Sequence, residues 1–324
     1  MKRYWKKMIS AMLAAVLSLS LYACGTAPAA KSDDGRLRVV ATNFPAYDFA
    51  RAVCGDVAEV QMLLPPGAES HSYEPTPQDM IDVENCDLFI YTGGESDTWV
   101  DTILNAVDGK REVLRMVDCV PTLEEETTEG MTTQEHDHEE DHGEEGGVVD
   151  VDEHVWTSPI NAVQIVEHIG EKVVALDESH AETYVENENA YLQELLALDE
   201  DFQEFFASIS NPVMVFGDRF PFRYFAEEYH VQYYAAFPGC STQTEPSAAT
   251  IAFLTEKIRQ EQLSTVYYIE FSNHLVADSI AEATGAQTAL FHSCHNVSRQ
   301  EMEAGATYVS LMRGNLETLR QTMQ

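Results

Sequence analysis

The sequence has few basic residues. Its 324 residues include 19 Lys and Arg against 55 Asp and Glu, which gives a formal net charge of −36 at pH 7. A chain this acidic repels phosphate backbones, so a nucleic-acid-binding function is excluded. Glycine and proline are scarce, at 17 and 12 residues, which excludes a collagen-like or linker-like chain. The hydrophobic share of 44% is ample for packed cores and excludes a wholly disordered chain.

The motifs of several common enzyme classes are missing as well. The sequence contains no GxSxG and no Walker-type phosphate loop, and HExxH occurs only as HEEDH at 138–142, inside an acidic run that lacks the helical pattern this motif needs. It also contains no CxxC pair, so a cysteine zinc knuckle is not supported. We therefore expect a binding protein and not an enzyme.

The N-terminus predicts export and a lipid anchor. Residues 1–23 combine a basic start with an apolar run from Met8 to Leu21, which is typical of a signal peptide. The run ends in Leu21-Tyr22-Ala23-Cys24, which resembles the bacterial lipobox, so Cys24 is the expected lipidation site. An uncleaved anchor helix is the alternative. Residues 24–36 then form a flexible tether, and the protein is expected outside the cytoplasm, lipid-anchored to the bacterial cell membrane.

Five further cysteines remain in an export context that permits disulfides. Their odd number means that at least one stays unpaired within the chain. The pairs Cys54–Cys86 and Cys240–Cys294 are each plausible, but the connectivity is open. The five are Cys54, Cys86, Cys119, Cys240 and Cys294.

Strand-like segments alternate with helical ones in both halves of the chain, which indicates βαβ units with mainly parallel sheets. We predict two Rossmann-like α/β lobes, at 37–176 and 211–324, joined by a long rigid linker helix at 177–210. The expected strands are 37–42, 58–64, 87–92, 212–216, 231–237, 264–271 and 287–291.

One segment breaks this alternation. Residues 124–153 hold 14 Asp and Glu and no Lys or Arg, so we expect a solvated, disordered loop inside the first lobe. His136, His138 and His142 are interleaved with its carboxylates. Such a run either does nothing specific or holds zinc weakly, and we favour an accessory metal-binding role.

Two histidines lie in the loops that follow predicted strands. His71 stands in GAESHSYEPTPQDM and His154 in DEHVWTSP. The carboxyl ends of strands are where open α/β sheets bind ligands. Neutral imidazole is a good ligand for zinc and a poorer one for calcium or magnesium. Both residues are therefore candidate zinc ligands.

The segments around these histidines resemble a known family. PPGAESHSYEPTPQDM, DEHVWTSPINAVQIVEHI and YVSLMRGNLETL are similar to signatures of the zinc/manganese substrate-binding lipoproteins of bacterial ABC uptake systems. The resemblance implies two lobes joined by a long helix, with one metal ion in the cleft and His71 and His154 as ligands. In the second lobe, FGDRFPFRYF lacks the usual ligand and offers only Asp218 beside Arg219.

The resemblance gives the second lobe's other ligand slot to ALFHSCHNVS, in which His292 is nearest the usual aspartate and His295 lies three residues on. We expect His71, His154 and His292 as ligands, with His295 as the next candidate. A histidine-dominated set favours Zn²⁺ over Mn²⁺.

The expected function is that of a monomeric, high-affinity zinc receptor that delivers zinc to the permease and ATPase subunits of an ABC importer. A manganese receptor of the same family is the nearest alternative. A surface adhesin on the same fold and a zinc hydrolase are alternatives of other classes. The hydrolase needs a general base at the metal, and the sequence assigns no carboxylate to that place.

Overall fold

The computed structural model describes residues 35–69, 73–107, 111–132, 151–241 and 245–323. Residues Arg36–Gln324 form one compact unit, which is described here by itself. Within the described ranges, no helix is both long enough and apolar enough to cross a membrane. The predicted signal peptide, Cys24 and most of the tether lie outside them.

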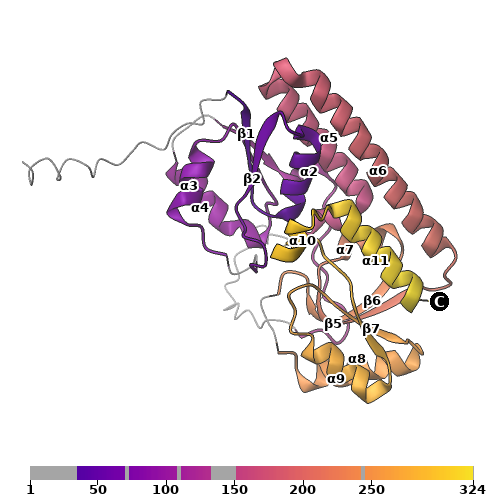
Figure 1. Cartoon of the computed structure of the whole chain (residues 1–324). Coiled ribbons are helices and arrows are strands. Elements are labelled where there is room, and N and C mark those ends of the chain that lie inside the picture. Colours follow the sequence, from indigo (N-terminus) through magenta and orange to yellow (C-terminus); the bar gives the residue numbers. More distant parts are fainter. Residues whose placement is uncertain (1–34, 70–72, 108–110, 133–150, 242–244, 324) are drawn as a thin grey trace, which may run out of the picture. The chain divides into compact units, whose positions relative to one another are not determined.

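The first half of the unit, whose strands β1 and β2 are labelled in Figure 1, is built on a four-stranded parallel sheet with the order β2-β1-β3-β4. Its strands are β1 (Leu37–Ala41), β2 (Ala58–Met62), β3 (Leu88–Tyr91) and β4 (Glu112–Arg115). Its connections are α2 (Phe44–Cys54), α3 (Pro77–Glu84), η2 (Glu95–Asp97), α4 (Thr98–Ala106) and η3 (Met116–Cys119). Side chains alternate between the faces of the strands. Val39 therefore packs on the side of α2, and Val40 packs with residues of α3 and α4.

The second half repeats this plan. Its sheet is also parallel and has the order β6-β5-β7-β8. The strands are β5 (Val213–Phe220), β6 (Gln232–Pro238), β7 (Thr265–Tyr268) and β8 (Gln287–Leu290). The helices are α7 (Arg223–Glu228), α8 (Ala248–Gln260), α9 (Leu275–Thr284), α10 (Arg299–Glu303) and α11 (Tyr308–Thr322). One face of this sheet is covered by α8 and α9.

Two long helices connect the halves. After η4 (Val155–Thr157), α5 (Pro159–Leu176) starts at its N-cap Ser158, and η5 (Glu178–His180) leads into α6 (Ala181–Ala207). Figure 1 shows α5 and α6 side by side. Helix α6 contacts α2 beside the first sheet and α11 beside the second. It therefore occupies the place predicted for the linker helix at 177–210.

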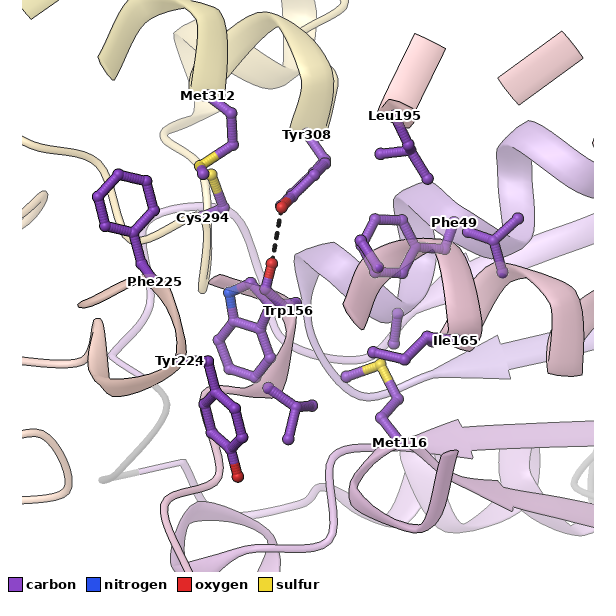
Figure 2. Packing of buried hydrophobic residues seen from close by; sticks show 14 of the residues in the cluster. Phe49, Met116, Trp156, Ile165, Leu195, Tyr224, Phe225, Cys294, Tyr308 and Met312 are labelled. Carbon is purple, nitrogen blue, oxygen red and sulfur yellow. Dashed lines mark hydrogen bonds between the residues drawn. The ribbon is translucent and has the colours of Figure 1, made fainter. Parts of the chain in front are cut away.

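The inner faces of the two sheets belong to one buried apolar cluster, part of which is shown in Figure 2. Trp156 and Tyr308 are fully buried in it. The Tyr308 hydroxyl donates to the Trp156 carbonyl at 2.7 Å, which ties α11 to the η4 segment. Two parallel α/β lobes with a long connecting helix confirm the predicted fold class. The shared core restrains movement of one lobe against the other.

Among the residues it describes, the structure contains neither of the two plausible disulfides, Cys54–Cys86 and Cys240–Cys294. Cys54, Cys86, Cys119, Cys240 and Cys294 are all buried and unpaired. Cys54 lies in the shared core and Cys86 in the cluster on the other face of the first sheet, so the sheet separates them. Burial raises the pKa of the Cys54 thiol to about 12, which keeps it protonated and unreactive.

The predicted loop at 124–153 is also corrected at its two ends. Glu124 forms an isolated antiparallel bridge with Val151, and the Thr132 amide donates to the Ala236 carbonyl at 2.9 Å. Backbone pairing therefore orders residues 124–132 and 151–153, although the composition predicted a solvated loop. Residues 133–150, including His136, His138 and His142, lie outside the described residues.

Candidate metal centre

A small cavity of about 20 Å³ lies where segments that follow strands of both sheets meet. That volume has room for one water molecule or one ion. Its lining comes from the segments after β2, β5, β6, β7 and β8 and from the turn before η4. The lining residues are Ala68, Glu69, His154, Arg219, Pro221, Gly239, Ile269, Glu270, Phe271, Ser293, His295 and Asn296.

His154 is held in this cavity by the turn that precedes η4. The Asp152 carboxylate oxygen Oδ1 accepts from the His154 backbone amide at 2.8 Å and lies 3.0 Å from the ring Nδ1. The ring is 1% exposed. Because Nδ1–H donates to Asp152, the imidazole carries its lone pair on Nε2, which is the tautomer of a metal-binding histidine supported by a carboxylate.

His295 comes from the loop after β8, residues 292–296. Asn315 of α11 holds the start of this loop, since its Oδ1 accepts from the His292 amide and its Nδ2 donates to the His292 carbonyl, both at 2.7 Å. The Trp156 indole Nε1 donates to the Ser293 carbonyl at 2.8 Å. These bonds fix His295 opposite His154, with 5.6 Å between the ring centroids.

A third metal-binding group joins the two histidines. One carboxylate oxygen of Glu153, one ring nitrogen of His154 and one of His295 lie within 4.8 Å of one another, and all three residues are buried. Oxygen and imidazole nitrogen are both ligands that zinc accepts. The arrangement therefore suits a divalent cation.

The electrostatics of this group also favour a cation. Burial opposes the charged imidazolium, but the Asp152, Glu153 and Glu125 carboxylates outweigh that effect and raise the pKa of His154. Burial raises the pKa of Glu153, and burial together with the Glu153 charge raises the pKa of Asp97 to about 7. Several buried acidic groups crowded together repel one another, and a bound cation relieves that repulsion.

The 217–219 segment supplies no ligand to this group. The Asp218 carboxylate accepts from the amides of Arg219, at 2.8 Å, and Ile269, at 3.5 Å. The Arg219 guanidinium makes two hydrogen bonds to Glu69, at 3.3 and 3.1 Å. Asp218 is thus engaged with the backbone, and Arg219 is engaged with a carboxylate.

The structure reverses the order in which the sequence analysis ranked His292 and His295. His292 is buried, but its Nδ1 accepts from the Cys294 amide at 2.9 Å, and its Nε2 is 3.7 Å from Glu301. It neither lines the cavity nor belongs to the buried group with His154. The turn of the loop uses the His292 ring, so this geometry favours His295 over His292 as the ligand from the loop. His71 and the three loop histidines lie outside the described residues.

Glu153 is the functional candidate that the sequence analysis missed. It stands at the end of the acidic run, where composition made it one carboxylate among many. The sequence analysis assigned no carboxylate to the place of a base at the metal, whereas the structure puts a Glu153 oxygen in the group with His154 and His295. Its adjacency to His154 was the available signal.

The chain is similar to proteins named as zinc-binding. A zinc-binding lipoprotein of Streptococcus pneumoniae is 33% identical over 98% of this chain, although the chain spans only 61% of that relative's length. A high-affinity zinc uptake protein of Bacillus subtilis is 29% identical over 98% of both chains. The crystal structure of the Zn(II)-bound domain of the pneumococcal protein superposes with a TM-score of 0.72, at 29% identity, over 89% of this chain and 99% of that domain.

The family model described as zinc-uptake complex component A, periplasmic, matches residues 39–322. That match covers both lobes, the connecting helices and the candidate metal centre, and the chain belongs to this family.

Proposed function

We propose that the protein is an extracytoplasmic zinc receptor that presents the ion to an ABC permease for import. The buried group of His154, Glu153 and His295 is the observation that carries this proposal. It is supported by the family match and by relatives named as zinc-binding. His154 and His295 bind the ion from the two sides of the cavity, and His71 is the further ligand that the sequence predicts.

Zinc fits this donor set better than manganese. Imidazole nitrogen suits zinc, whereas manganese prefers sites dominated by carboxylate, carbonyl and water oxygens. A hydrolase is disfavoured even though a carboxylate lies at the site. A cavity of about 20 Å³ admits an ion but no ester or peptide substrate. Binding and transfer of the ion are therefore the chemistry that the site supports.

Two features outside the described residues complete the proposal. Lipidation of Cys24 anchors the receptor to the membrane, beside the permease and ATPase that it serves. His136, His138 and His142 raise the local zinc concentration near the cavity as weak, exchanging ligands. The receptor works as a monomer.

The test is zinc uptake by the source bacterium with its chromosomal copy deleted. The intact chain should restore uptake of radioactive zinc under zinc limitation, and His154→Ala or His295→Ala should not. His292→Asn, whose amide oxygen replaces the Nδ1 acceptor, should restore it, as should the exposed control His168→Ala. Restoration by His154→Ala and His295→Ala together with failure of His292→Asn would contradict the assignment.

A further inference from the structure

The second lobe contributes few ligands to the candidate metal centre. Segment 217–219 provides no ligand, because Asp218 accepts backbone amides and Arg219 is paired with Glu69. Glu270 also lines the cavity, but its carboxylate accepts from the Ser293 amide and hydroxyl and so supports the 292–296 loop. Among the described residues of the second lobe, only His295 belongs to the group around His154.

Glu153 has the properties of the missing ligand. Its side chain is fully buried, and Oε2 accepts from the Ser96 amide at 2.9 Å. Oε1 is buried and has no hydrogen-bond partner in the part of the chain that the structure describes. A buried carboxylate oxygen without a partner is costly, and a bound cation satisfies it.

The backbone around Gly94 is shaped to admit this side chain. A Cβ atom added at Gly94 would collide with the Cβ and Oε2 atoms of Glu153. Gly94 is therefore needed for the close approach of the β3–η2 segment to Glu153, and the Ser96 amide of that segment then orients the carboxylate.

We propose that Glu153 binds the zinc ion through Oε1 as a direct ligand, in place of a ligand from segment 217–219. This inference rests on the proposed function. It makes the coordination asymmetric, with adjacent residues Glu153 and His154 held by the first lobe's turn and His295 by the 292–296 loop. Displacement of that loop then removes one ligand while the others retain the ion.

The test uses the full-length, metal-free protein with Zn²⁺ and with Co²⁺ as a spectroscopic probe. Glu153→Gln should lower zinc affinity by about tenfold or more and change the visible absorption of the bound Co²⁺, whose bands report ligand type and geometry. The matched control Asp218→Asn removes a buried carboxylate next to the cavity and should leave the Co²⁺ spectrum unchanged.

Gly94→Ala is the second variant, because it keeps the carboxylate but displaces it. Gly94→Ala should change the Co²⁺ spectrum in the same way as Glu153→Gln. If Glu153→Gln does not fold, Gly94→Ala tests the role of Glu153 in its place. A Co²⁺ spectrum identical to the parent's in the folded variants would overturn the inference, whether or not affinity falls. If His295→Ala still abolishes zinc binding in that case, the proposed function stands and only the role of Glu153 is lost.

Discussion

The substitution Asn315→Leu tests how the 292–296 loop is held. Asn315 is 3% exposed, and its amide makes two hydrogen bonds of 2.7 Å to the backbone of His292. Leucine is similar in size and makes neither bond. Each buried backbone group left unpaired costs about 1–3 kcal/mol, so with two such groups we expect a loss of about 2–6 kcal/mol in the free energy of unfolding.

The assay is urea unfolding of the metal-free protein, which keeps ligand binding out of the comparison. The control Asn189→Leu removes a single hydrogen bond on the exposed side of α6, at 2.7 Å to Val185, and should cost less than about 0.5 kcal/mol. Zinc affinity of Asn315→Leu should fall by about tenfold, because the same loop carries His295. A stability change for Asn315→Leu no larger than the control's would refute this reasoning, and unchanged zinc affinity would refute the link to His295.

Three further predictions concern other parts of the molecule. Burial opposes ionisation of Asp177, but hydrogen bonds from Ser179, His180 and Tyr184 outweigh it and lower the pKa of Asp177 from 3.8 to about 2. Because the pKa of Asp177 is lower in the folded state than in the unfolded state, its ionised carboxylate stabilises the fold above pH 4, and this stabilisation is lost as the pH falls toward 2. Asp177→Asn should therefore lower the free energy of unfolding by about 1–2 kcal/mol at pH 7. If urea titrations show that this loss does not shrink toward pH 3, the prediction is contradicted. The five buried cysteines should be inert to a thiol reagent in the native protein, and all five should react in denaturant. If only one or three of them react in denaturant, the others form disulfides and the prediction is wrong. Trp156→Phe removes the hydrogen bond to the Ser293 carbonyl and should lower the free energy of unfolding by about 1–2 kcal/mol. Equal thermal stability of the variant and the parent protein would argue against this.

The sequence predicted most of the architecture because burial of parallel strands leaves a strong hydrophobic pattern. It missed β4, whose residues 112–115 read EVLR and contribute only one buried side chain. It also left the pairing of the cysteines open, with two pairs plausible because their members lie within the same lobe. Pairing depends on which face of a sheet each thiol occupies, and Cys54 and Cys86 occupy different ones.

The site was predicted less completely for a related reason. His292 and His295 both follow β8, and their spacing cannot decide which ring enters the cavity. The choice is made by Asn315, which lies in the last helix, and by Trp156, which lies in the other half of the chain. Such long-range hydrogen bonds leave no local pattern in the sequence.

The most direct test of the account is a competitive titration of the chain from Gly25 onward with zinc and manganese. It should be made with the parent, with residues 133–150 deleted, and with His154 and His295 both replaced by alanine. The account predicts one tight zinc ion that survives the deletion, far weaker manganese binding, and loss of the tight zinc ion in the double variant. Tight zinc binding that disappears with residues 133–150 and persists without the two histidines would contradict it.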